Sequence, residues 1–411
     1  MLKVLTPDEA LDLIKEKFSP LSATETVPLS AASGRVLAAD IRAEEYVPGF
    51  DRSTVDGYAL RSADCFGCSE SIPALLNLSH SVSMGESAGS AIAPGGCAYV
   101  PTGAAIPMGA DAVAMIEYCE DFGDGTIALS KAVAPGENLI LKGDDVYPGK
   151  LIIPAGRLIS ARDIGSLAAM GISRVEVCRK PIVGIISTGD ELVDTDTVPA
   201  EGQVRDINSP MLAALVEEFG CESRRFGIVK DEEELLSRSL DDAIAQCDCV
   251  LISGGSSVGT KDATARIIES RGEVFFHGIA MKPGKPTILG RAGDKAVFGL
   301  PGHPGAAWFV SRIFVRTALE RLMGRESHPI SLRARLTESV SANHGRAQYG
   351  GVSLFKENGV WYAHPQRSKS GLISTLCSAD GFFCIPRDRE GCAAGEEIEV
   401  TLYSTHQEVN T

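Results

Sequence analysis

The segment CDCVLISGGSSVGTKDATARIIES (247–270) decides the fold of the central part of the chain. A short apolar run leads into a loop of glycines and serines, and a helical pattern follows the loop. Glycines between a strand and a helix let several backbone N–H groups converge on an anion at the helix N-terminus. The segment therefore predicts a strand–loop–helix unit with an anion-binding loop. The residues expected to form this loop are Ser253, Gly254, Gly255, Ser256, Ser257 and Gly259.

Strands and helices alternate on both sides of this unit. The apolar run IVGIIS (182–187) precedes the acidic loop TGDEL (188–192), a helix is expected from Ser209, and EVFFHGIA (273–280) leads into KPGKP (282–286). This alternation predicts a doubly wound α/β domain. In such a sheet, ligands bind beyond the carboxyl ends of the strands, so we expect these polar loops to share one site.

Two lysines and several carboxylates in these loops indicate the kind of ligand. Lys282 and Lys285 would repel each other unless a multiply charged anion lay between them, although a solvated turn is the alternative. Asp190, Glu191 and Asp262 are unfavourable beside an anion unless they bind a cation, and Mg²⁺ prefers one or two carboxylates together with phosphates. The loops therefore predict a phosphate bridged by magnesium.

Asp231 has two interpretations. It follows the expected strand RRFGIV (224–229), which would bring it into the same group of carboxylates. It also precedes a helical pattern with Glu234 three residues on, the arrangement of a helix cap. The sequence leaves both interpretations open.

The pattern changes on either side of the α/β domain. From about 20 to 178, short apolar runs are broken by glycine and proline, which indicates one or two β-rich modules with long loops. From about 328 the chain returns to short alternating strands, which predict a small C-terminal β domain.

The bulk composition limits the class of protein. The chain has 411 residues, enough for several domains, and a formal net charge of −15, which argues against nonspecific nucleic-acid binding. No apolar run approaches the roughly 18 residues of a membrane span, and the N-terminal segment carries acids where a signal peptide is apolar. We therefore expect a cytoplasmic protein with no membrane or nucleic-acid partner.

The eleven cysteines show no disulfide or zinc framework. Cys65 and Cys68 form a close pair that, with His80 and Cys97, would supply the ligands of a zinc ion, but nothing in the spacing requires this. Reduced and mostly buried thiols are the simpler expectation.

Several motifs occur in an order that resembles the molybdopterin molybdenumtransferase family, which includes bacterial MoeA and the E domain of gephyrin. The resemblance extends from about residue 5 to 403. Each motif alone is modest, but their order leaves little room for chance. The motifs are PGFDRSTVDGYA (48–59), PTGA (101–104), GENL (136–139), STGDEL (187–192), SGGSSVG (253–259), KPGKP (282–286) and GLPG (299–302).

The resemblance implies a division into domains. An N-terminal helix and a discontinuous linking domain (1–45 and 146–178) would flank a β-rich domain (46–145). A MogA-like α/β domain (179–326) and a C-terminal β-barrel domain (327–411) would follow. Family members form elongated homodimers, in which the active cleft lies between the α/β domain of one subunit and other domains of its partner.

The resemblance also implies a reaction. Adenylylated molybdopterin and molybdate would react in the presence of Mg²⁺ to give AMP and molybdenum cofactor. A MogA-like adenylyltransferase would supply the substrate, and molybdoenzyme apoproteins would receive the product.

By family pattern, site residues fall into three groups. The catalytic candidates are Asp56, Thr102, Asp145, Asp231 and Asp262. The metal candidates are Asp190, Glu191 and Asp262. The candidates for binding the pterin nucleotide and the oxyanion are the glycine loop (253–257 and Gly259), Lys282, Lys285, Pro301, Gly302 and Ser370.

The sequence departs from the family pattern where the oxyanion is expected. His303 and Ala306 stand where family members commonly have Asn and Ser, and Gly351 lies where an Arg is expected. Ile140 and Leu141 also replace arginines. These changes leave open a divergent paralogue, either a tungstate-specific insertase or a non-catalytic molybdopterin carrier, besides the molybdate enzyme. A MogA-like adenylyltransferase is a further alternative, against which the DGYA and PTGA modules argue.

Overall fold

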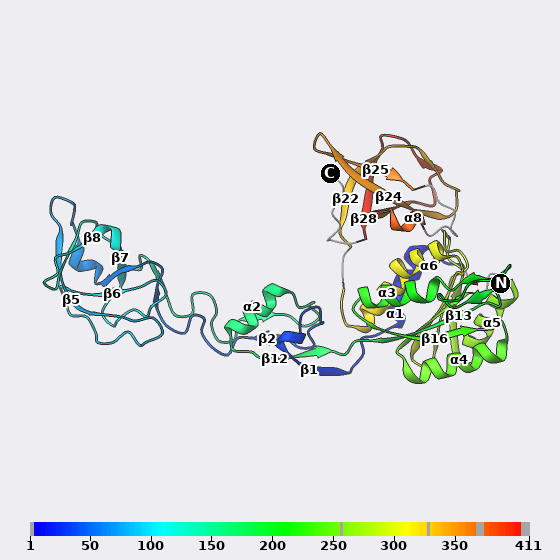
Figure 1. The fold of residues 1–411 in the computed structure, drawn as a ribbon, viewed down its shortest axis with the longest axis horizontal. Coiled ribbons are helices and arrows are strands. Elements are labelled where there is room, and N and C mark those ends of the chain that lie inside the picture. Colours follow the sequence, from blue (N-terminus) through cyan, green and yellow to red (C-terminus); the bar gives the residue numbers. More distant parts are fainter. Residues whose placement is uncertain (1–3, 255–257, 327–328, 367–373, 404–411) are drawn as a thin grey trace.

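The computed structural model describes residues 4–254, 258–326, 329–366 and 374–403, and the side chains of 258–262 and 375 lie outside the described part. The chain is elongated (Figure 1), with a β-rich domain at one end, a small linking domain in the middle, and the α/β domain and a C-terminal barrel together at the other end. Within the described residues, no helix has both the length and the apolar character that crossing a membrane requires.

A six-stranded sheet forms the α/β domain. Its order is β16 (Glu222–Val229), β13 (Ile182–Thr188), β17 (Cys249–Gly254), β21 (Lys295–Leu300), β20 (Ile288–Ala292) and β18 (Gly272–His277). Only β20 runs antiparallel to its neighbours. Because the parallel strands end at the same edge, their carboxyl-terminal loops are brought together there, as the pattern predicts.

Helices cover both faces of this sheet, so the predicted doubly wound arrangement is confirmed (Figure 1). Alternate residues of β13 show why: Val183 and Ile185 belong to one buried cluster and Ile186 to the other. The helices on the first face are α1 (Pro7–Lys17), α3 (Asn208–Glu218), α6 (Pro304–Val310) and α7 (Arg316–Leu322), and those on the second are α4 (Glu233–Gln246) and α5 (Val258–Glu269).

The β-rich domain is a second six-stranded sheet. Its order is β7 (Ala112–Met115), β4 (Gly57–Leu60), β6 (Gly96–Val100), β5 (Ala74–Ser81), β9 (Thr126–Leu129) and β8 (Cys119–Asp121). Cys65, Cys68, Cys97 and Cys119 are free thiols in or against its core. Burial raises the pKa of Cys97 to about 11 and that of Cys119 to about 12. In the part of the chain that the structure describes, no group of three acidic, Cys or His residues is placed to hold a metal.

The linking domain is built from segments on both sides of the β-rich domain. Strand β1 (Thr24–Pro28) pairs with β12 (Arg174–Cys178), and β2 (Ile41–Arg42) pairs with β11 (Leu151–Ile153). Helix α2 (Ala161–Ala169), which the sequence pattern does not predict, packs beside them. The chain therefore passes through this domain twice.

The C-terminal domain is a closed barrel. Its strands are β24 (Ala347–Glu357), β25 (Val360–Pro365), β22 (Ser331–Leu336), β28 (Glu397–Leu402) and β26 (Gly381–Ile385), and β26 pairs with β24 to close it. The barrel contacts α6 through aromatic rings. Phe309 lies 5.7 Å from Phe382, and Trp308 lies 5.5 Å from Tyr403, between ring centroids. Contacts of this size and geometry hold the barrel against the α/β domain.

We predict that Gly57→Ala destabilises the β-rich domain by about 1–3 kcal/mol. A Cβ at this position would lie 1.9 Å from the carbonyl oxygen of Ala114, on the neighbouring strand. Gly165→Ala is the matched control, because Gly165 lies in α2 with no atom within 4 Å of the added Cβ. It should gain about 0.5–1 kcal/mol. Thermal melts of the two variants should shift in opposite directions, and a similar shift in both would contradict the prediction.

Candidate functional site

The carboxyl ends of β17 and β21 are joined through the side chain of Asn208, the first residue of α3. Its Nδ2 donates hydrogen bonds to the Ser253 Oγ at 2.8 Å and to the Gly302 carbonyl at 2.9 Å. Because a carbonyl oxygen can only accept, the amide nitrogen must face Gly302. Asn208 is 7% exposed, and its Oδ1 is buried with no hydrogen-bond partner among the described residues.

The sequence pattern misses Asn208 because it predicts a helix from Ser209. The helix begins one residue earlier, and Asp206 accepts a hydrogen bond from the Ser209 N–H at 3.0 Å. One feature of the sequence could have indicated Asn208: it is a short polar residue at the start of a helix that begins beside the sheet edge.

Gly254 allows the ends of β13 and β17 to approach closely, and Gly302 lies beside it at an ordinary contact distance. Gly254 has φ of 141°, and a Cβ there would lie 1.9 Å from the Thr188 carbonyl oxygen. A Cβ at Gly302 would lie 3.7 Å from the Cα of Gly254. Pro301 and Gly302 lead directly from β21 into α6. Ser253, Gly254, Pro301 and Gly302 are therefore brought together, whereas Gly255, Ser256 and Ser257 lie outside the described residues and Gly259 is described only in its backbone.

Acidic residues from two loops meet at this edge. The Thr188 Oγ1 donates to the Asp231 Oδ1 at 2.6 Å, and the Asp231 N–H lies 3.3 Å from the Asp190 Oδ1. The helix-cap interpretation of Asp231 is wrong, because α4 begins at Glu233 after Glu232 and Asp231 instead accepts from the end of β13. The carboxylate is thereby held at the strand end.

Glu191 is fixed in the same loop. Its carbonyl accepts a hydrogen bond from the Val204 N–H at 2.8 Å, between the short paired strands β14 (Leu192–Val193) and β15 (Val204–Arg205). The Asp262 side chain lies outside the described part. Asp190, Glu191 and Asp231 are carboxylates of the type that magnesium accepts, but as the structure places them these three do not form a metal-binding group by themselves.

The loop with Lys282 and Lys285 lies at the same edge. It joins β18 to β20, where His277 is paired with Ile288 and Ile288 with Gly299, close to the end of β21. Both lysines are exposed. The short strand β19 (Met281–Lys282) pairs with β24 of the barrel. The lysine loop therefore lies between the sheet edge and the C-terminal domain.

Three of the positions that depart from the family pattern lie on elements next to this loop, whereas Ile140 and Leu141 lie beside the β-rich domain, where Ile140 is paired with Arg52. His303 is exposed just before α6, and Ala306 is buried within it. At Gly351, an added Cβ would lie 3.2 Å from the Ala379 Cβ and 3.8 Å from the Tyr403 hydroxyl. The space beside Gly351 is therefore already lined by other side chains. Ser370 lies outside the described residues.

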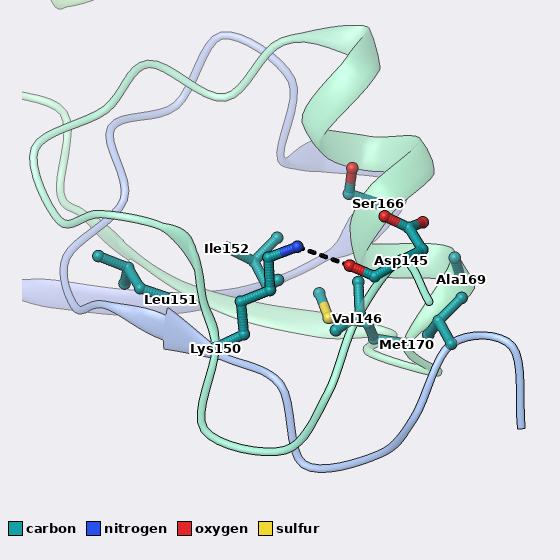
Figure 2. Close-up of a pocket in the computed structure, with 9 residues that line it drawn as sticks. Asp145, Val146, Lys150, Leu151, Ile152, Ser166, Ala169 and Met170 are labelled. Atoms are coloured by element: carbon teal, nitrogen blue, oxygen red, sulfur yellow. Dashed lines mark hydrogen bonds between the residues drawn. The ribbon is translucent and has the colours of Figure 1, made fainter. Parts of the chain in front are cut away.

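The remaining predicted residues lie in other parts of the chain (Figure 1). The Thr102 N–H and hydroxyl both donate to the Asp56 Oδ1, at 2.6 and 2.9 Å. Both hydrogen bonds lower the pKa of the Asp56 carboxyl, and the bond from the Thr102 backbone N–H has the larger effect. Asp145 lines a separate cavity of about 240 Å³ beside the linking domain (Figure 2). Within one chain, neither Asp56 nor Asp145 lies at the sheet edge.

Family models match nearly the whole chain. The model described as "MoeA N-terminal region (domain I and II)" matches residues 5–171. That described as "Probable molybdopterin binding domain" matches 184–321, and "MoeA C-terminal region (domain IV)" matches 333–403.

Full-length relatives are similar over the same extent. A molybdopterin molybdenumtransferase of Bacillus subtilis is 31% identical, with 98% of this chain and 95% of that protein covered. One of Staphylococcus aureus is also 31% identical, over 96% of this chain and 94% of that protein. The crystal structure of a molybdopterin biosynthesis MoeA protein from Pyrococcus horikosii has a TM-score of 0.86 and 38% identity, covering 98% of this chain and 100% of that one.

We predict that Asn208→Ala lowers the free energy of unfolding by about 1–3 kcal/mol, because it leaves the buried Ser253 hydroxyl and the partly buried Gly302 carbonyl without their donor. Asn77→Ala, at an exposed position on β5, is the control and should stay within about 0.5 kcal/mol of the parent protein. Chemical denaturation measures both. Equal stability of the two variants would show that the link from Asn208 contributes nothing.

We also predict that Thr102→Val raises the pKa of Asp56, because the hydroxyl bond is lost while the backbone bond remains. A lowered pKa in the folded state stabilises the fold above the unfolded-state pKa, and this contribution disappears as the pH falls through the folded value. The variant should therefore differ in stability from the parent at neutral pH and approach it in acid. NMR titration of the Asp56 carboxyl tests this, and an unchanged pKa would refute it.

Proposed function

Because the chain belongs to the MoeA family of molybdopterin molybdenumtransferases, we propose that it inserts molybdate into adenylylated molybdopterin and releases AMP. The chain is a transferase of molybdenum cofactor biosynthesis. In the proposed reaction, water attacks the AMP phosphorus, the bond to the pterin phosphate oxygen breaks, and AMP leaves. The two dithiolene thiols bind the molybdenum of molybdate, and one oxo group leaves as water with the two thiol protons.

The observation that carries this proposal is the convergence at the sheet edge. Asn208 holds the ends of β17 and β21 together, and Gly254 allows the end of β17 to lie against that of β13. Such an edge leaves main-chain N–H groups and the start of α5 available to a phosphate. Lys282 and Lys285, on the adjacent loop, would draw the oxyanion and the phosphates to an otherwise acidic protein.

The carboxylates at the edge would hold magnesium. Asp190, Glu191 and Asp262 are the proposed ligands, and the bond from Thr188 fixes Asp231 beside them. When bound, the ion would offset the charge of the phosphates and polarise the phosphorus. The protein's own contribution is to orient the phosphates by its backbone and to position the oxyanion between the lysines.

A homodimer with a shared cleft completes the proposal. Asp56, Thr102 and Asp145 lie away from the sheet edge of their own chain (Figure 1), so they would reach the substrate from the partner subunit. A MogA-like adenylyltransferase would form the adenylylated substrate, and molybdoenzyme apoproteins would accept the cofactor.

The surroundings of Gly351 favour a second candidate. The position lacks the expected cation, and Ala379 and Tyr403 line the space beside it. Losing one charge-assisted hydrogen bond would weaken oxyanion binding by roughly tenfold to a hundredfold. A tungstate-specific insertase or a molybdopterin carrier would follow from such a loss.

One assay separates these candidates. AMP release from adenylylated molybdopterin is measured with Mg²⁺ and with molybdate, tungstate or neither. Release stimulated by molybdate supports the proposed transferase, and release stimulated by tungstate alone supports the second insertase. Tight binding of the pterin nucleotide without oxyanion-dependent release indicates the carrier, and pyrophosphate formed from ATP and molybdopterin would indicate an adenylyltransferase.

We predict that Asp262→Ala abolishes AMP release while leaving the dimer intact. Removing a proposed metal ligand should affect the reaction without disturbing the parts of the chain that contact a partner. Asp294→Ala is the matched control, since Asp294 is an exposed carboxylate in the same domain, in the turn between β20 and β21 at the opposite edge of the sheet. Unchanged turnover in Asp262→Ala would remove the metal assignment, and size-exclusion chromatography checks the dimer.

A further inference from the structure

An open cavity of about 240 Å³ lies where helix α2 meets the strand that returns from the β-rich domain (Figure 2). Ile152, Ala169 and Met170 contribute apolar walls, and Asp145, Lys150 and Ser166 contribute polar groups. The exposed lining is more polar than apolar, and a small number of placed polar groups is what fixes the orientation of a ligand in a small-molecule site. Its volume is sufficient for a two-ring heteroaromatic compound.

The charged groups of this cavity are not paired with each other. The Lys150 Nζ donates to the backbone carbonyl of Asp145 at 2.6 Å, and Figure 2 shows the carboxylate directed away from that ammonium. Among the described residues, the Asp145 carboxylate has no hydrogen bond or ion pair. It can therefore accept two hydrogen bonds from a ligand, while Lys150 keeps further N–H donors.

We propose that this cavity binds the pterin ring of the substrate by its 2-amino-4-oxopyrimidine edge. The N–H groups of ring N3 and the 2-amino group donate to the two oxygens of Asp145, and the 4-oxo group accepts from Lys150. Two parallel N–H donors match a carboxylate in spacing and charge. Met170, with its polarizable sulfur, suits contact with an aromatic ring. The inference rests on the proposed function, since it states which part of the proposed substrate binds in the cavity.

The same charges exclude the other parts of the substrate. The Asp145 carboxylate repels phosphate and molybdate, and the cavity offers only one ammonium, Lys150, which already donates to the Asp145 carbonyl, so the cavity is less suited to an oxyanion than a loop with two lysines. The sheet edge with Lys282 and Lys285 lies in the α/β domain, whereas the cavity lies at the linking domain (Figure 1). One substrate molecule is therefore held by the cavity of one subunit and the sheet edge of its partner.

Exchange of a carboxylate for an amide tests the assignment. Pterin and lumazine, its 2,4-dioxo analogue, are titrated by fluorescence into the full-length protein. The parent protein should prefer pterin by about tenfold or more, because lumazine replaces a donor with an oxygen that faces a carboxylate oxygen. Asp145→Asn should reverse the preference, because its amide donates to the 2-oxo group and opposes the 2-amino group.

Two further variants test whether the effect is specific to Asp145 and to the cavity. Asp144→Asn alters the neighbouring carboxylate, which accepts from the Leu141 N–H outside the cavity, and should keep the parent preference. Ala169→Trp fills the cavity from an exposed position on α2 and should abolish binding of both compounds. Reversal in Asp145→Asn supports the assignment, because lost folding or a purely structural role would weaken both ligands alike.

Other results overturn the proposal. An absent preference in the parent protein, an unchanged preference in Asp145→Asn, or full binding in Ala169→Trp would place the pterin elsewhere. The AMP-release assay keeps this failure apart from failure of the proposed function. If AMP release depends on the oxyanion but the protein shows no preference for pterin, only the assignment of the cavity is wrong. If Asp145→Asn reverses the preference but no AMP is released, the cavity assignment stands and the proposed transferase reaction is wrong.

Discussion

The Thr188 carbonyl oxygen and Gly254 lie so close that only hydrogen fits on the Gly254 Cα. This contact brings the end of β17 beside the start of the acidic loop that follows Thr188. Because Asn208 fixes the next strand end through Gly302, the edge consists largely of backbone held at short separation. In the proposed reaction, a rigid edge of this kind would need little reorganisation when an anion arrives, so binding energy would be available for orienting the phosphates.

The barrel extends this rigid edge. Aromatic contacts between α6 and the barrel lie directly after the Pro301–Gly302 turn, and β19 pairs with β24 beside the lysine loop. Arg312, whose side chain is 7% exposed, adds to this packing, with its guanidinium 5.0 Å from the Trp308 ring and 5.3 Å from the Tyr403 ring. Movement of the barrel would therefore move the lysine loop, and the oxyanion half of the proposed site depends on both domains.

Periodicity was enough to predict the α/β domain, because an apolar strand, a glycine loop and a helix follow one another within a short segment. Contacts between distant segments were not accessible in the same way. Asp231 resembles a helix cap locally, yet its partner Thr188 lies 43 residues earlier. Asn208 donates hydrogen bonds to Ser253 and Gly302, and no local sequence pattern connects it to these distant residues. The cavity at Asp145 is assembled from segments near residues 47, 150 and 169, so its carboxylate could be named but not its surroundings.

The separation of charge along the chain has a consequence for how a substrate is oriented. The pterin carries N–H donors at one end, and its phosphate and metal-binding sulfurs lie towards the other. A carboxylate cavity and a lysine loop in two different domains favour opposite ends of such a molecule, and reversing it would place phosphate against Asp145 and ring donors against two ammonium groups. Both mismatches are unfavourable, so orientation is determined before any catalytic group acts.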